Sequence, residues 1–95
     1  MLNWTAAAEA GLWLDDRSLA SAAYERLAPY AGRSSCAGSG NANGPVDAFL
    51  AQAAAAVGER ALATQHADRA LELCEEWAIP LAAQWLREQR ERFSF

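Results

Sequence analysis

Residues 50–73 read LAQAAAAVGERALATQHADRALEL, and this stretch decides the fold class. It contains an alanine-rich helix, the turn Val57-Gly58-Glu59-Arg60, and a second helix. Alanine lets two antiparallel helices cross closely, and glycine supplies the positive φ that a helix end often needs. The stretch therefore predicts a helical hairpin that stacks on other helices.

Composition indicates an all-α fold in a single domain over residues 1–95. Alanine supplies 24 of the 95 residues, which favours helix over strand. The only β-branched residues are Thr5, Val46, Val57, Thr64 and Ile79. All eight basic residues are arginine and the net charge is −4, so we expect no direct binding of nucleic acid.

The first hairpin is expected over residues 2–31, with one helix from about Leu2 to Leu14 and another over about 17–31. Apolar residues recur at spacings of three and four in the first of these helices. Asp15 or Asp16 can cap the second, since a carboxylate accepts backbone N–H bonds there. Residues 32–44 are rich in serine, glycine and asparagine and predict a loop.

The second hairpin is expected over residues 45–77, and it repeats the first at an offset of 43. At this offset Ala20 corresponds to Ala63, and the two turns coincide. A last helix over about 80–93 follows the break at Ile79-Pro80. Two antiparallel hairpins and a C-terminal capping helix, five helices in all, are therefore predicted, because the last helix would cover the apolar face of the second hairpin.

The second hairpin resembles a tetratricopeptide (TPR) repeat. The matching positions are Leu50, Ala51, Gly58, Ala63, Ala70 and Leu71. The first hairpin matches less fully, because Asp15 replaces the turn glycine. The resemblance implies that the first helix of each hairpin lines a binding groove.

About residues 12–95 are also similar to the C-terminal helical-repeat region of large bacterial transcriptional regulators, which are multidomain signal-transduction ATPases. The similarity rests on LASAAYERLAPYAGR, the Ser/Gly-rich loop and the segment beginning GPVDAFLAQ. There is no GxxxxGK[ST] phosphate loop, so ATP hydrolysis and DNA binding are not carried over to any residue. The resemblance implies a module that binds a protein or peptide, including other domains of a parent regulator, or senses an effector.

The predicted groove residues come from the first helix of each hairpin. They are Thr5, Glu9, Leu12, Trp13, Gln52 and Ala56. Trp13 is expected to make the main contact, since tryptophan combines a large apolar area with a donor and is enriched in binding hot spots. Glu9 and Gln52 are expected to select the partner by polar contacts. A core position for Trp13, against Leu19 or Tyr24, stays open.

The sequence also predicts positions for the other tryptophans and for two phenylalanines near residue 95. Trp4, Trp77 and Trp85 lie on apolar helix faces and are predicted to be core residues. Phe93 and Phe95 are candidate contacts to a partner or to a second copy.

The sequence predicts no enzyme activity, catalytic residue, metal site or cofactor. His66 is the only histidine, and spacing suggests no partner within hydrogen-bond reach, so a surface or interhelix position is expected. Cys36 and Cys74 have no metal-like spacing and are predicted to be reduced thiols.

Two alternative functions stay open. A small apolar ligand could be held by Trp13, Tyr24 and Trp85, or the chain could have a structural role through self-association into a homo-oligomer. The structural role is suggested because only two repeats are visible, whereas about three or more stacked repeats are usually needed for stability. No apolar run approaches about 18 residues and no signal pattern is present, so we expect a soluble, cytoplasmic protein without membrane contact.

Overall fold

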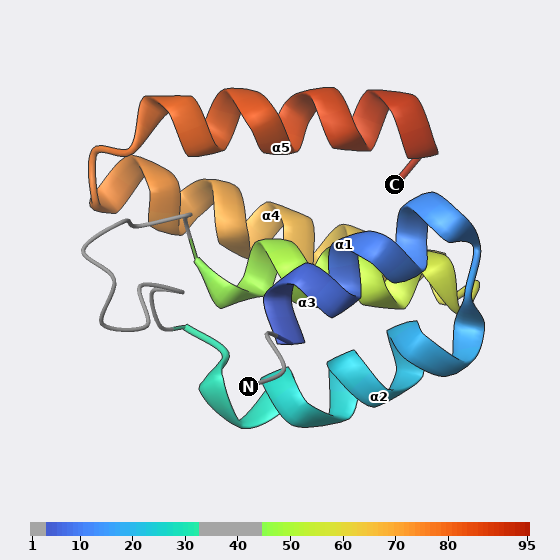
Figure 1. Ribbon diagram of the computed structural model, residues 1–95. Coiled ribbons are helices and arrows are strands. Elements are labelled where there is room, and N and C mark those ends of the chain that lie inside the picture. The colour runs from blue at the N-terminus through green and yellow to red at the C-terminus, as the bar shows by residue number, and fades with distance from the viewer. Residues whose placement is uncertain (1–3, 33–44) are drawn as a thin grey trace.

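The computed structural model describes residues 4–32 and 45–95, with side chains from Ala7 onward in the first segment. The regular elements are α1 (Trp4–Leu14), α2 (Arg17–Leu27), the short 3-10 helix η1 (Ala28–Tyr30), α3 (Val46–Ala56), α4 (Arg60–Glu76) and α5 (Pro80–Phe93). They form two hairpins, α1–α2 and α3–α4, and a last helix that packs on α4 (Figure 1). The predicted all-α class and its five helices are confirmed.

Two predictions fall on parts of the chain that the structure does not describe. The start of the first helix at Leu2 is one of them, and the loop over residues 32–44 is the other, apart from Gly32. The second helix ends at Leu27 rather than at Ala31. Proline lacks the N–H that an α-helix needs, and here Pro29 stands within the tighter η1 turn.

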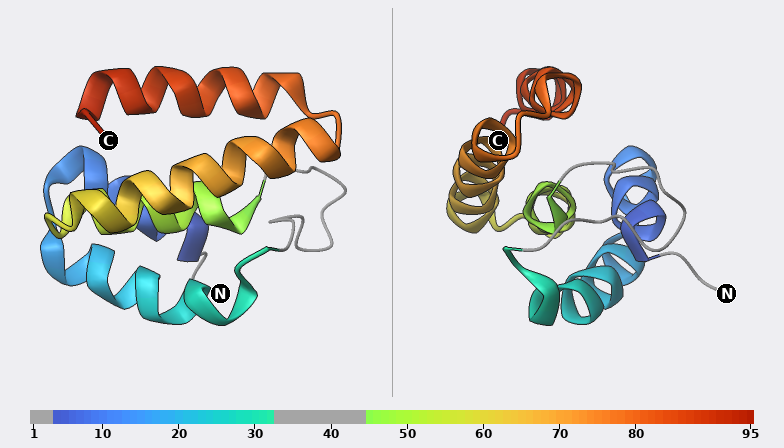
Figure 2. Two further views of the ribbon diagram at one scale, coloured as in Figure 1. Left: turned by 180° about the vertical axis from the view of Figure 1, so that it is seen from behind. Right: turned by 90° about the vertical axis from the view of Figure 1, so that its left-hand side faces the viewer.

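Helix α3 lies at the centre of the described structure. It packs against α1 and α2 as well as against its hairpin partner α4 (Figures 1 and 2). Every residue of α3 except Ala55 is buried. Apart from Asp47 and Gln52, α3 is apolar all round, as is typical of a core helix, and its small side chains allow neighbouring helices to come close on several sides.

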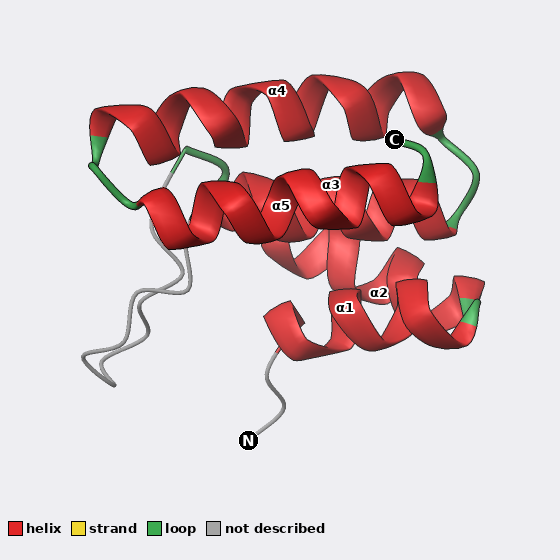
Figure 3. Ribbon diagram, turned by 90° about the horizontal axis from the view of Figure 1, so that it is seen from above, coloured by secondary structure: helices red, strands yellow, loops and turns green. Residues whose placement is uncertain are grey.

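Helices α4 and α5 run side by side on the face of the molecule away from α2, as the view from above shows (Figure 3). Buried residues of α5 recur at spacings of three, and they are Ala83, Leu86 and Gln89. The opposite face of α5 is exposed and polar at Gln84, Arg87 and Glu91. This amphipathic pattern is the one expected of a helix that ends a stack.

The helix ends share one kind of turn. A residue with positive φ follows α1, α3, α4 and α5, namely Asp15 (53°), Gly58 (87°), Ala78 (52°) and Ser94 (60°). The next N–H donates to the carbonyl five residues earlier, at N···O distances of 2.9 Å, or 3.2 Å in the case of Phe95. This arrangement satisfies carbonyl groups that the helix leaves unpaired. Asp15 and Gly58 are equivalent at the offset of 43, which supports the internal repeat.

Of the two predicted caps, Asp16 is the N-cap of α2. Its Oδ1 accepts a hydrogen bond from the N–H of Leu19 at 3.1 Å. Asp16 has the extended backbone that an N-cap adopts, whereas Asp15 forms the turn. The two neighbouring carboxylates therefore have different roles.

The crossing of α1 and α2 depends on Gly11, which sequence reasoning did not single out. A Cβ atom at Gly11 would lie 3.0 Å from both the Cβ and the backbone N of Ala20. Ala20 itself is fully buried. Glycine is therefore required here because the two helices approach each other closely.

Among the described residues, no helix is both long and apolar enough to cross a membrane.

We expect Gly11→Ala to lower the free energy of unfolding by about 1–3 kcal/mol, because the added methyl group overpacks the crossing. In an exposed helix interior the same change raises stability by about 1 kcal/mol, so the sign of the effect tests the close approach. Urea unfolding measures it. Ser21→Ala, on the exposed side of α2, is the control and should change stability by less than about 0.5 kcal/mol. A more stable Gly11→Ala protein would contradict the crossing geometry.

Candidate functional site

Trp13 lies at the exposed end of α1, where two side chains of α5 hold it. Its side chain is 45% exposed, and the neighbouring Leu14 is 73% exposed. The Trp13 ring meets Phe93 edge to face, with centroids 5.1 Å apart and planes at 82°. The guanidinium carbon of Arg92 lies 4.4 Å from the centroid of the Trp13 ring. Trp13 is therefore an oriented aromatic ring with a large solvent-facing surface.

The two contacts are strong enough to orient the ring. An edge-to-face aromatic pair contributes about 0.5–1.5 kcal/mol, and an exposed cation–π contact contributes about 0.5–1 kcal/mol. Both partners, Phe93 and Arg92, come from the last two turns of α5. The first hairpin and the last helix are thus joined at Trp13.

The other predicted groove residues are placed less favourably for contact with a partner. Glu9, one turn before Trp13 on α1, is partly exposed. Leu12 and Ala56 are buried at 8% and 6% exposure. The side chain of Thr5 lies outside the part of the chain that the structure describes. Of the six predicted residues, Trp13 and Glu9 therefore present surface.

Gln52 is completely buried in a polar contact between α3 and α5. Its Nε2 donates to Oε1 of Gln89 at 3.3 Å, and Gln89 is itself only 7% exposed. The Oε1 atom of Gln52 has no hydrogen-bond partner. Gln52 thus positions α5 against α3, and it presents no surface through which it could act as a polar selector.

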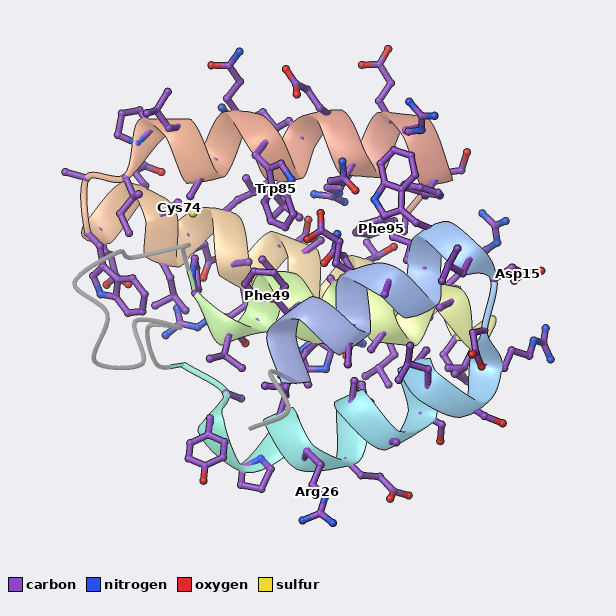
Figure 4. The ribbon with its side chains drawn as sticks, viewed as in Figure 1. Asp15, Arg26, Phe49, Cys74, Trp85 and Phe95 are labelled. Carbon is purple, nitrogen blue, oxygen red and sulfur yellow. The ribbon has the colours of Figure 1, made fainter. Side chains whose placement is uncertain are left out.

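The remaining aromatic predictions have mixed outcomes. Trp85 is half-buried and faces Phe49 between α5 and α3, with ring centroids 5.5 Å apart (Figure 4). Trp77 is exposed at 36%, so its predicted core position is wrong, because it follows the last turn of α4 rather than lying on its buried face. Phe95 is only 7% exposed, so its ring offers little surface for the contact with a partner or a second copy that the sequence suggested. The side chain of Trp4 is not described.

A chain of polar groups connects three helices beside this core. The Tyr24 hydroxyl lies 2.8 Å from Nε2 of His66, and Nδ1 of His66 lies 3.8 Å from Oδ2 of Asp47. The other oxygen of Asp47 accepts a hydrogen bond from the N–H of Gly32 at 2.6 Å. Asp47 is 3% exposed. The chain links α2, α4 and α3 to the segment that follows η1.

Burial raises the pKa of Tyr24 above its usual value of 10.0, so the phenol stays protonated at neutral pH. A protonated phenol can donate its hydrogen bond to Nε2 of His66 when the imidazole carries its proton on Nδ1, the nitrogen that faces Asp47. The arrangement orients three side chains and gives no activated nucleophile, because an activated phenol would need a lowered pKa.

Sequence reasoning left a surface or an interhelix position open for His66, and it missed the partners that His66 has between the helices. The available signal was the buried alanine stripe of α4, formed by Ala63, Ala67 and Ala70, which passes directly beside His66. The offset of 43 also pairs His66 with the fully buried Ala23. Both facts predict a partly buried histidine, but neither identifies Tyr24, which lies 42 residues earlier.

Within the described residues, no group of three or more histidine, cysteine, aspartate or glutamate side chains could hold a metal ion. Cys74 is a buried thiol without a disulfide. Its burial raises its pKa, against a smaller lowering by Arg87. Cys36 lies outside the described residues.

Comparison with known proteins gives no match to any family model, any curated protein or any solved structure.

We expect Tyr24→Phe to lower the free energy of unfolding by about 1 kcal/mol, because His66 loses its hydrogen-bond partner inside the structure. Tyr30→Phe is the matched control, since Tyr30 is 52% exposed, and its effect should stay below about 0.5 kcal/mol. Chemical unfolding of both variants measures the difference. Equal effects of the two substitutions would show that the hydroxyl contact with His66 contributes nothing.

Proposed function

We propose that this chain is a non-enzymatic helical binding module that takes up a protein or peptide segment on the surface around Trp13. The observation that carries the proposal is that Trp13 is 45% exposed although Phe93 and Arg92 hold its ring in place. Tryptophan is enriched among the residues that contribute most to binding, which supports a binding role for this ring.

Orientation matters because binding must offset the freedom that side chains lose. Immobilising a mobile side chain at an interface costs about 0.5–1.5 kcal/mol. Contacts with α5 already restrict the Trp13 side chain, so less side-chain freedom is lost when a partner binds. Leu14 at 73% exposure extends the apolar surface, and Glu9 adds a carboxylate one turn away. A partner segment with an apolar side chain and a donor group fits this surface best.

The resemblance to bacterial transcriptional regulators suggests where such a module would act. In those proteins the helical-repeat region is joined to ATPase and DNA-binding domains and serves as the sensor. We propose the same role for this chain, in the cytoplasm, with a protein, a peptide or another domain of the same regulator as the partner.

The small-ligand alternative receives less support from the geometry. It would use Trp13, Tyr24 and Trp85 around one molecule. Each of these rings instead contacts a different side chain, namely Phe93, His66 and Phe49 respectively. Self-association remains open, and concentration-dependent stability would support it.

Selection of peptides from a random library against the intact protein tests the proposal. The selected peptides should bind Trp13→Ala at least tenfold more weakly, since loss of a hot-spot residue costs about 2 kcal/mol or more. Trp77→Ala is the matched control, because Trp77 is also exposed but lies at the end of α4, and it should retain affinity within about twofold.

Circular dichroism and thermal unfolding must first show that both variants are folded. Full affinity of the selected peptides for a folded Trp13→Ala protein would refute the site. Recovery of small apolar compounds that raise the melting temperature, without any peptide, would favour the ligand-binding alternative.

A further inference from the structure

Arg92, in the last turn of α5, is an exposed cation whose position is set by aromatic rings. Its guanidinium carbon lies 4.4 Å from the centroid of the Trp13 ring and 6.0 Å from the centroid of the Phe93 ring. None of the ion pairs or hydrogen bonds between the described side chains involves Arg92. The side chain is exposed, so its donors face solvent.

Arg90, two residues earlier on the same helix, shows what Arg92 lacks. Nη1 of Arg90 donates to Asp68 at 3.0 Å, and Nε and Nη2 donate to the main-chain oxygen of Phe95 at 3.3 and 3.2 Å. All three nitrogens of Arg90 thus have acceptors within the molecule. Arginine carries five N–H donors and no acceptor, so the donors of Arg92 remain available to a group from outside.

The contact with Trp13 restricts Arg92 without using these donors. The ring attracts the guanidinium through its quadrupole, which requires no oxygen or nitrogen acceptor. Glu88 is exposed one turn earlier on α5, at the spacing at which helix ion pairs form, yet the ion pairs of the described residues do not include it. The paired N–H groups of Arg92 are therefore oriented but not engaged, which reduces the side-chain freedom lost when an acceptor binds.

A carboxylate is the acceptor that fits these N–H groups best. The planar guanidinium presents parallel N–H groups that match the two oxygens of a carboxylate. The surface beside it is apolar, because Trp13 is 45% and Leu14 is 73% exposed. Tryptophan and arginine are both enriched among binding hot spots, and here the two side chains are in contact.

The charges near Trp13 give the surface a direction. The net charge of −4 provides no general attraction for an acidic segment, so a preference for one must come from Arg92 itself. Glu9, one turn before Trp13, presents a carboxylate on α1, whereas Arg92 presents a cation on α5. A segment that binds here has its acidic group toward α5 and its donor group toward Glu9.

We propose that Arg92 binds a carboxylate of the partner segment, so that the surface around Trp13 recognises an acidic side chain next to an apolar one. The apolar side chain packs on Trp13 and Leu14, and an aspartate or glutamate beside it accepts two hydrogen bonds from Arg92. This inference rests on the proposed function, because it assigns the chemistry of the partner at the same surface.

The peptides selected against the intact protein provide the test. They should be enriched in aspartate or glutamate. Replacing that residue by asparagine or glutamine should weaken binding to the wild-type protein about tenfold or more, which is the loss typical of a charged hydrogen bond. With Arg92→Gln, the acid and amide forms of the peptide should bind within about twofold of each other.

Calorimetric titration measures the four affinities, which form a double-mutant cycle. An acid-to-amide ratio that is the same for the wild-type protein and for folded Arg92→Gln protein would overturn the inference. Selected peptides without an acidic residue would overturn it as well.

Two further variants separate the paired N–H groups from simple charge. Arg92→Lys should retain only part of the preference for the acid form, since lysine keeps the charge but not the planar pair of donors. Arg87→Gln is the matched control, because Arg87 is also exposed on α5 but lies near Cys74 of α4, and it should keep the full preference. Equal losses in Arg87→Gln and Arg92→Gln would show that only the general charge of α5 matters.

The outcomes distinguish this inference from the proposed function. Peptides that lose affinity for Trp13→Ala but bind equally well in their acid and amide forms would leave the Trp13 site in place and overturn the role of Arg92. Failure to select any peptide would overturn both.

Discussion

The close packing of helices around α3 is the constraint on which the rest of the structure depends. α3 contacts α1, α2 and α4, and all of its residues except Ala55 are buried. Close approach on several sides requires small side chains, which explains the alanine run of α3 and the crossing of Gly11 with Ala20. Larger side chains on α3 would push the two hairpins apart, and a larger residue at Gly11 would separate α1 from α2.

Small side chains also limit how much the centre contributes to stability. Each buried methyl group contributes about 0.8 kcal/mol, against about 1.5–3 kcal/mol for a buried leucine or phenylalanine. The larger buried apolar side chains therefore lie around α3, where α5 packs. Trp85 of α5 contacts Phe49, and Phe95, which follows α5, belongs to the core cluster. The last helix is thus part of the core rather than an addition to it. Among the described side chains, its only hydrogen bond to α3 is the long contact between Gln52 and Gln89.

Features that depend on local sequence were predictable, and contacts between distant residues were not. The hairpins, the turn at Gly58, the cap near Asp16 and the offset of 43 follow from spacing and from the conformational preferences of single residues. Periodicity identifies the buried face of a helix but not the side chain that meets it. The contact of Tyr24 with His66 therefore could not be predicted, nor could the burial of Gln52 by α5. Trp13 was singled out by its residue type alone, and its partners on α5, about 80 residues away in sequence, could not be predicted.

The last turn of α5 and the residues that follow it connect the two hairpins at one end of the molecule. Arg92 and Phe93 face Trp13 on the first hairpin, while Arg90 and Phe95 bind to α4 of the second. The same four residues therefore hold the two hairpins in register at this end of the molecule.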